Sequence, residues 1–202
     1  MVQRTYSLEQ TSQERKQMIL PTAYLAPISW YSLFLHNDCQ IEVMESYEKQ
    51  TMRNRCVIVD ANGTQQLSVP VKKSEHKQLT RDVEISYQTN WQHVHLEALK
   101  SAYKNTPFYD YYIDFLLPHY TRQYTYLIDL NISLHQTVME LLRQTRPLIL
   151  TSYWQGCRNL NDSFEDNVQP YYQIFADKNG FKNNLSIVDL LFNMGNEAIL
   201  YL

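Results

Sequence analysis

The sequence predicts an α+β fold: a mixed sheet of short strands with an Asn-Gly hairpin, packed against several helices. Two apolar runs rich in β-branched residues flank Asn62-Gly63, the dipeptide favoured in tight hairpins. Residues 125–144 carry a continuous apolar stripe at helical spacing. The predicted strands come mostly before the helices, without the regular βαβ alternation of a doubly wound sheet, and this order favours the mixed class.

The first residues differ in character from the rest of the chain. Residues 1–17 are polar and charged without periodicity, so we predict a polar tail. The chain of 202 residues is long enough for one domain, and we predict that 18–202 form a single one.

Short elements follow the tail. Residues 18–20 predict a strand that ends at Pro21, because proline cannot donate to a strand ladder. Pro27 suits the first position of a mostly apolar helix, and residues 40–46 alternate as a strand does. The hairpin comes next, and Pro70 closes its second strand or places that strand on an edge.

The middle of the chain turns from strand to helix. Residues 83–87 predict one more short strand, and Asn90 then caps a helix. One face of that helix carries Trp91, His95, Ala98 and Ala102. A second helix is predicted between Pro107 and Pro118. The helix of residues 125–144 has a stripe made of Leu127, Leu130, Leu134, Val138 and Leu141.

The last third alternates extended and helical segments. Residues 147–152 are β-like, and 153–170 are polar, which predicts a surface loop. Residues 171–175 predict a short strand or extended segment, and 184–195 predict a helix that stops at Gly195. The ending "AILYL" predicts a terminal strand or a packed apolar tail.

Composition narrows the function classes. The net charge of −3 argues against a nucleic-acid partner, which a basic face would attract, and 4 glycines are too few for a glycine-rich phosphate loop. No apolar run is long enough for a membrane span, and the tail lacks the apolar core of a secretory signal. The 3 scattered cysteines indicate reduced thiols, so we expect a cytoplasmic protein.

Several separated motifs carry a family resemblance. They are "LPTAYLAP", "YEKQTMRNRC", "LSVPVKK", "NWQHVHLEALKSAYKNTPFYDYY", "PYYQIF" and "LSIVDLLFNMG", in this order. Together they resemble the WbqC-like protein family, in the short form common among Bacteroidetes. The resemblance extends from Leu20 to the C-terminus.

The family resemblance implies a biological setting for the protein, but it does not imply a reaction mechanism. The family is named for a component of O-antigen gene clusters, and its members are placed with transferases that decorate sugars, including a suggested aminoacyl (glycyl) transfer. The longer members open with a Gln-Pro-x-Tyr pattern, whereas Leu20 occupies the glutamine position here. They also carry an extra segment before the final tyrosine-rich motif, which is short in this chain.

The loop of residues 47–55 is the first candidate binding site. Tyr47, Lys49, Asn54 and Arg55 occupy the family motif. A lysine and an arginine there predict a grip for a carboxylate, a phosphate or the pyrophosphate of a nucleotide-sugar. The structural alternative is that Arg55 begins a strand and pairs with Asp38 or Glu45.

Trp91 and His95 form the second candidate group, one turn apart on a helix. A histidine on an apolar stripe is commonly a core residue bonded to a backbone carbonyl. The functional alternative makes His95 a general base, with Tyr103 and Tyr24 orienting a hydroxylated substrate.

Asp189 is the third candidate, because it is the one charge inside an apolar helix. A buried carboxylate needs a partner, and we expect Arg55 or His95 to supply it. As a structural buttress Asp189 has no catalytic role, whereas as an orienter of His95 it completes a base-carboxylate pair.

Other chemistries have little support in the sequence. His93 and His95 do not share a helix face, and neither Glu97 nor Asp110 has diagnostic spacing, so we predict no metal site. No nucleophile motif occurs, and nothing indicates a cofactor.

The sequence therefore favours a cytosolic transferase that acts on a sugar or another polar anionic metabolite, possible reactions being acyl or aminoacyl transfer in polysaccharide biosynthesis. In this hypothesis Lys49 and Arg55 hold the anion, His95 is the base and Asp189 positions it. The alternative is a non-catalytic ligand-binding or scaffold protein. A shared cleft for Lys49, Arg55 and His95 would favour the enzyme, and individual pairing in the core would favour the scaffold.

Overall fold

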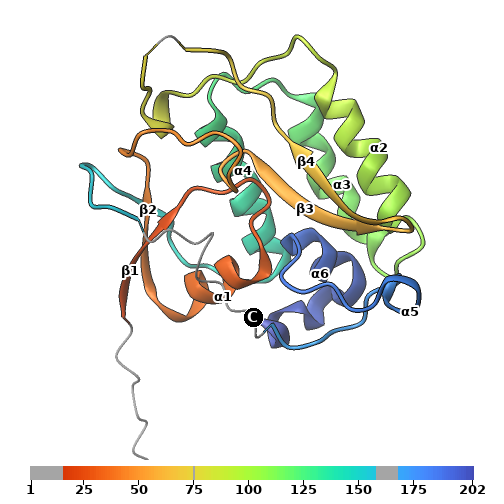
Figure 1. Cartoon of the computed structure of the whole chain (residues 1–202). Coiled ribbons are helices and arrows are strands. Elements are labelled where there is room, and N and C mark those ends of the chain that lie inside the picture. Colours follow the sequence, from red (N-terminus) through yellow and green to blue (C-terminus); the bar gives the residue numbers. More distant parts are fainter. Residues whose placement is uncertain (1–15, 75, 158–167) are drawn as a thin grey trace, which may run out of the picture.

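The computed structural model describes residues 16–74, 76–157 and 168–202. It contains a parallel three-stranded sheet, an antiparallel hairpin and helices that surround both (Figure 1). This arrangement confirms the predicted α+β class. Residues 1–15 of the predicted tail and 158–167 of the predicted loop lie outside the described residues, and Gln17 already belongs to the first strand.

The parallel sheet joins the beginning of the chain to its later part. Its strands, in spatial order, are β1 (Gln17–Pro21), β2 (Asp38–Glu42) and β5 (Ile149–Leu150). Helix α1 (Ile28–His36) connects β1 to β2, as a crossover between parallel strands requires. The sequence pattern predicted short strands here, but it did not predict that they pair in parallel.

The hairpin consists of β3 (Arg55–Asp60) and β4 (Gly63–Ser68). Its turn is centred on Ala61 and Asn62, one residue earlier than an Asn-Gly turn. The Asp60 carboxylate accepts a hydrogen bond from the Asn62 N–H at 2.6 Å, and Gly63 has φ +121°. A glycine is suited to that position because residues with a Cβ avoid such angles.

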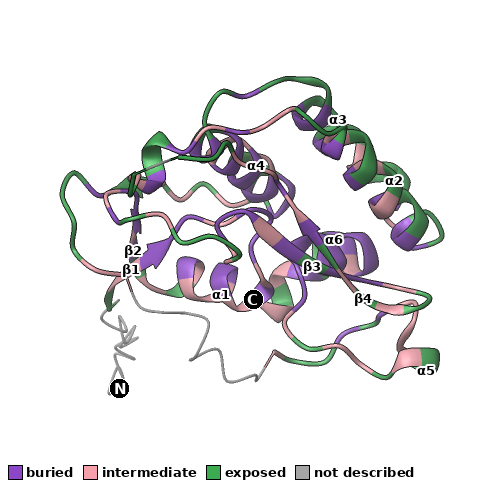
Figure 2. Cartoon of the chain, turned by 45° about the horizontal axis from the view of Figure 1, so that its top comes forward, coloured by how far each residue is buried: buried purple, intermediate pink, exposed green. Residues whose placement is uncertain are grey.

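Helices occupy most of the second half of the chain. They are α2 (Trp91–Tyr103), α3 (Tyr109–Thr121), α4 (Leu127–Leu141), α5 (Ala176–Asn179) and α6 (Ile187–Met194), with 3₁₀ turns at η1 (Thr80–Asp82) and η2 (Gly195–Tyr201). The hairpin contacts both α2 and α6 (Figure 1). Figure 2 shows that α6 is largely buried, whereas α2 and α3 carry exposed residues on their outer sides.

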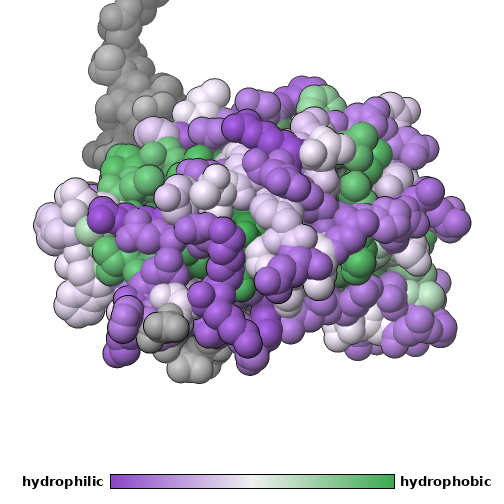
Figure 3. All heavy atoms as spheres, turned by 90° about the horizontal axis from the view of Figure 1, so that it is seen from above, coloured by the Kyte–Doolittle hydropathy of each residue, from purple (hydrophilic) through white to green (hydrophobic). Residues whose placement is uncertain are grey.

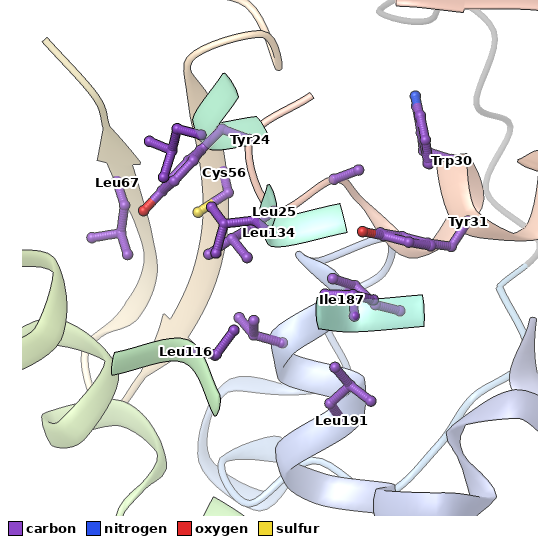
Figure 4. Packing of buried hydrophobic residues seen from close by; sticks show 14 of the residues in the cluster. Tyr24, Leu25, Trp30, Tyr31, Cys56, Leu67, Leu116, Leu134, Ile187 and Leu191 are labelled. Carbon is purple, nitrogen blue, oxygen red and sulfur yellow. The ribbon is translucent and has the colours of Figure 1, made fainter. Parts of the chain in front are cut away.

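Apolar side chains from all parts of the chain form one core. The predicted stripe of α4 is buried along its whole length. Figure 4 shows Tyr24, Cys56 of β3 and Leu134 of α4 close together, with Ile187 of α6 nearby. Burial of such side chains is the main driving force for folding, at about 25 cal/mol per Å² of apolar surface.

Three predicted segments are not strands. Residues 83–87 form only isolated bridges, Val71 with Ile85 and Glu84 with Tyr126. Residues 171–175 form no strand, and most of the terminal AILYL segment belongs to η2, which ends at Tyr201. Ala198, Tyr201 and Leu202 pack on the core, which confirms the packed-tail alternative. Each segment has a strand-like composition, but among the described residues none of them pairs with a strand in a continuous ladder.

The longest described helix is α4, with 15 residues. None of the helices in the described part of the chain has the length and apolar character needed to cross a bilayer. The face seen in Figure 3 is mostly hydrophilic, with smaller apolar areas between the polar side chains.

Candidate functional site

A buried ion pair lies beside the 47–55 loop. The Arg53 guanidinium donates from Nε to the Glu45 carboxylate at 2.6 Å, and its Nη2 lies 2.5 Å from the same oxygen. The side chains are only 5% and 11% exposed, and the Glu48 carboxylate approaches Nη1 at 3.8 Å. The positive charge of Arg53 is therefore compensated within the protein.

Arg55 differs from Arg53 in this respect. Its side chain is half-buried, and it forms no hydrogen bond or ion pair with any part of the chain that the structure describes. The two carboxylates expected to pair with Arg55 have other partners. Glu45 pairs with Arg53, and Asp38 pairs with Arg146. Arg55 does begin β3, as the structural alternative expected, but it pairs with neither Asp38 nor Glu45. Within the described residues this half-buried cation has no counter-charge.

Two further residues of the loop have unsatisfied polar atoms. The Tyr47 hydroxyl is buried without a hydrogen-bond partner, and burial raises its pKa to about 12 although Arg53 and Arg55 oppose the shift. The Asn54 amide donates to the Val69 carbonyl at 2.9 Å, and its Oδ1 has no partner. Tyr47 and Arg55 are therefore close enough to interact, and both have unused hydrogen-bonding capacity.

Lys49 lies on the exposed part of this loop. Its ammonium forms no ion pair within the described residues. It adds positive charge near the loop surface, where salt screens its attraction for an anion.

His95 lies in an aromatic cluster inside the core. It is 3% exposed, and its Nδ1 shares a hydrogen bond with the Tyr24 hydroxyl at 2.8 Å. The Tyr24 hydroxyl also bonds the Tyr120 hydroxyl at 2.6 Å, and the Trp91 ring packs edge-on against the imidazole. Burial lowers the pKa of His95 to about 4, and a hydrogen bond with the Ser68 backbone opposes that shift.

Asp189 lies in a second buried cluster. Tyr171 donates its hydroxyl proton to Oδ2 at 2.5 Å, and no ion pair joins Asp189 to a cation among the described residues. The expected partners Arg55 and His95 are therefore wrong. Burial raises the pKa of Asp189 to about 6, against the stabilising effect of the Tyr171, Tyr103 and Gln173 side chains. Oδ1 has no hydrogen bond of good geometry.

Tyr103 belongs to the Asp189 cluster and not to that of His95. The Val59 N–H donates to its hydroxyl at 3.4 Å, which ties α2 to β3. Because eight residues separate His95 from Tyr103, they lie about 12 Å apart along the helix. The candidate residues thus form three clusters, around Arg55, His95 and Asp189.

The clusters of Arg55 and His95 face different sides of the hairpin. Cys56 points towards Tyr24, which bonds His95 (Figure 4). Arg55 precedes Cys56 in the same strand, and neighbouring residues of a strand point to opposite faces. The hairpin therefore separates the guanidinium from the imidazole. The individual hydrogen bonds of His95 and Asp189 suit structural roles for both.

Sequence reasoning missed one cluster next to the loop. The Cys157 thiol donates to Glu45 Oε2 at 2.9 Å, and Arg53 Nη2 lies 3.6 Å from the sulfur. Glu42 is fully buried and accepts hydrogen bonds from the Thr151 hydroxyl and the Gln155 N–H, both at 2.9 Å. More than 100 residues separate these partners in the sequence, so no local pattern could have revealed them.

The described residues contain no group of three or more His, Cys, Asp or Glu side chains suited to a metal ion. Near the loop lie cations, hydroxyls, amides, one thiol and the carboxylates of Glu45 and Glu48, and Arg53 compensates the Glu45 charge. Cations, hydroxyls and amides offer hydrogen-bond donors. Such groups bind anions and polar hydrogen-bonding ligands.

A comparison with models of protein families shows to which family this chain is related. The model of the WbqC-like protein family matches residues 40–165, more than half of the sequence. The chain belongs to the WbqC-like protein family. No curated protein and no solved structure gives a significant match.

The WbqC-like region contains the 47–55 loop, the Glu45–Arg53–Cys157 cluster and His95. Tyr24 and Asp189 lie outside it. The predicted family is thereby confirmed.

Proposed function

We propose that this WbqC-like protein binds a small polar metabolite through an anionic group at Arg55, and that it is a transferase acting on such a metabolite, a sugar or a sugar derivative. The observation that carries the proposal is the half-buried, unpaired guanidinium of Arg55. Arginine presents a planar fork that binds a carboxylate through two parallel hydrogen bonds. The setting that the family resemblance implies, among transferases that decorate sugars, supports the reaction class.

The charges around the loop favour a ligand with one negative charge. Arg53 is neutralised by Glu45, and Glu48 adds a further negative charge at 3.8 Å from Arg53. Arg55 is left as the main available cation, with Lys49 at the exposed edge. A pyrophosphate would bring at least two negative charges close to these carboxylates, so we favour a carboxylate ligand.

In this proposal we assign structural roles to His95 and Asp189. Each is buried and bonded to a tyrosine, which favours maintenance of the core over contact with a substrate. The three cysteines are unpaired, and this supports the expected cytoplasmic location, because thiols persist in a reducing compartment.

A non-catalytic ligand-binding protein is the second candidate. The internal bonding of His95 and Asp189 favours it, because neither residue is free to act as base or orienter. Both candidate functions include an anion site at Arg55. They differ only in whether the protein converts the bound ligand into a product.

Thermal-shift and calorimetric titrations test the anion site. The ligands are glycine, lactate and glucuronate as carboxylates, glucose as the neutral control and UDP-glucose as the pyrophosphate. A carboxylate at 100 times its Kd should stabilise the wild-type protein by about 2.7 kcal/mol. The shift should vanish in Arg55→Ala, weaken in Lys49→Ala and persist in Lys100→Ala, which removes an exposed cation from α2.

Two outcomes would refute the anion assignment: a carboxylate shift that survives Arg55→Ala, or no shift with any carboxylate. Incubation of the bound ligand with acceptor amines and sugars, followed by mass spectrometry, then separates the two candidates. A new covalent product supports the transferase, and binding without product supports the ligand-binding protein.

A further inference from the structure

Two buried polar side chains of α4 face one narrow slot. Asn131 is 2% exposed and His135 is 6% exposed. They lie one helical turn apart, which brings the two side chains onto the same face of the helix. Both line a slot whose other walls include Trp30, Tyr31 and Leu148.

Three polar atoms at this slot have no hydrogen-bond partner among the described residues: Oδ1 of Asn131 and both ring nitrogens of His135. The orientation of the Asn131 amide is determined by its surroundings. Its Nδ2 donates to the Arg53 carbonyl at 2.8 Å, which accepts only, and to the Thr22 hydroxyl at 3.2 Å. Exchanging the amide oxygen and nitrogen would lose the first bond, so Oδ1 remains unsatisfied.

The imidazole cannot easily turn towards another partner. The Tyr31 ring stacks on it with an interplanar angle of 12°, and the Phe34 and Trp30 rings pack edge-on with centroids 4.7 Å and 5.5 Å away. A ring packed on three sides by aromatic groups keeps its orientation. Unsatisfied buried polar groups of this kind are rare in native proteins and indicate an occupant.

The size of the slot limits what the occupant is. The space open to the centre of a water molecule is about 10 Å³, which is the room that one water needs. Asn131 Oδ1 requires a donor, and a ring nitrogen of neutral histidine requires either a donor or an acceptor, depending on the tautomer. One water molecule satisfies either tautomer, because it can donate to Asn131 Oδ1 and can also donate to or accept from the histidine nitrogen.

We propose that the slot between α1 and α4 is a binding site for one water-sized uncharged molecule, occupied by water in the free protein, which bridges Asn131 Oδ1 and a ring nitrogen of His135. The bridge completes the hydrogen bonding of Asn131. Asn131 in turn holds the Arg53 carbonyl, two residues before Arg55. The bound molecule therefore stabilises the backbone of the 47–55 loop at Arg53.

A crystal structure at a resolution that shows ordered water tests the proposal directly. The expected result is a density peak about 2.7–3.2 Å from both Asn131 Oδ1 and one His135 nitrogen. An empty slot in a map that resolves other buried waters would overturn the proposal. So would a peak that touches neither side chain.

Solution NMR gives a second, independent measurement. The Asn131 side-chain amide should show a cross-peak to long-lived water, and the cross-peak should be lost in His135→Phe. Asn193 is the matched control, because it is 3% exposed and both its amide groups have protein partners. If His135→Phe fails to fold, the wild-type protein still tests the proposal, because its Asn131 amide should show the water cross-peak and its Asn193 amide should not. Water cross-peaks of equal intensity at the two amides would contradict the proposal. Arg55→Ala should leave the cross-peak unchanged, so this result is separate from that of the anion site.

Discussion

The Arg53 guanidinium lies 2.5 Å from the Glu45 carboxylate, and both side chains are nearly inaccessible to solvent. Arg55, two residues later, has no such partner. The two arginines of one loop thus have different environments. We therefore expect their replacement to change the free energy of unfolding by different amounts.

Arg53→Ala should lower the free energy of unfolding by about 3–5 kcal/mol, because it leaves Glu45 buried and uncompensated. Arg55→Ala should change it by less than about 1 kcal/mol, because no hydrogen bond or ion pair with the described residues is lost. Urea unfolding of both variants measures the difference. Equal losses for the two arginines would mean that Arg55 has a structural partner after all.

His95 and His135 should make stability depend on pH. Burial lowers the pKa of each from 6.5 to about 4, so the unfolded chain takes up protons that the folded protein does not. Their stabilising contribution is present above pH 6.5 and is lost as the pH falls through about 4, by about 1.4 kcal/mol per pH unit for each histidine. Urea unfolding of wild type and His135→Phe at several pH values measures one histidine's share. If the free-energy difference between them stays constant from pH 7 to pH 4.5, His135 does not titrate as expected.

Asp189→Asn should stabilise the protein at neutral pH. Burial raises the pKa of Asp189 from 3.8 to about 6, so the folded protein favours the protonated form. The stabilising contribution of this raised pKa is complete below pH 3.8 and is lost as the pH rises through about 6. The asparagine keeps an acceptor for Tyr171 without the charge, and we expect a gain of about 1–3 kcal/mol at pH 7. The gain should shrink towards pH 4, and a gain independent of pH would contradict this explanation.

Gly195→Ala should destabilise the protein more than Gly180→Ala. Both glycines have positive φ, +58° and +69°, with ψ −130° and 164°, and a residue with a Cβ loses about 1–3 kcal/mol in such sparsely populated conformations. A Cβ on Gly195 would also lie 2.6 Å from the Phe108 ring, whereas nothing lies within 4 Å at Gly180. Thermal unfolding should therefore show a larger loss for Gly195→Ala, by at least about 1 kcal/mol. Equal losses would show that Phe108 moves away freely.

Cys157 should react slowly with iodoacetamide at neutral pH. Burial, together with the hydrogen bond to Glu45, raises the pKa of its thiol to about 12, so little thiolate is present. Glu45→Gln removes the negative charge and leaves Arg53 beside the sulfur, so alkylation should accelerate. Mass spectrometry of the labelled peptide gives the rate, with the buried Cys56 as the internal reference. An unchanged rate in Glu45→Gln would exclude Glu45 as the cause.

Local sequence patterns predicted the helices and turns whose formation depends on residues close together in the sequence. The hairpin forms in the expected segment because two strand-like runs flank a short turn, although that turn lies one residue before the Asn-Gly dipeptide. The stripe of α4 is buried as its spacing indicates, and Gly195 ends α6. In the segment 83–87 the same kind of pattern was misleading, because a strand also needs a partner strand beside it.

The candidate site was predicted only in part. The 47–55 loop was found from its charges and its family motif, but the sequence suggested Glu45 as a partner for Arg55, and Arg53 has it instead. Asp189 was expected beside a cation and lies beside Tyr171. The need for a partner followed from the chemistry of a buried charge, whereas the choice of partner depended on where distant segments meet.

The sequence by itself determined the class of fold, the main helices, the hairpin and the membership of the WbqC-like family, because these depend on periodicity, turn residues and motif order within short stretches. The tertiary structure decided which charges are compensated and which side of the hairpin each candidate residue faces. The physical reason is that a hydrogen bond or ion pair acts over a few ångströms, and folding alone brings residues such as Glu45 and Cys157 within that distance.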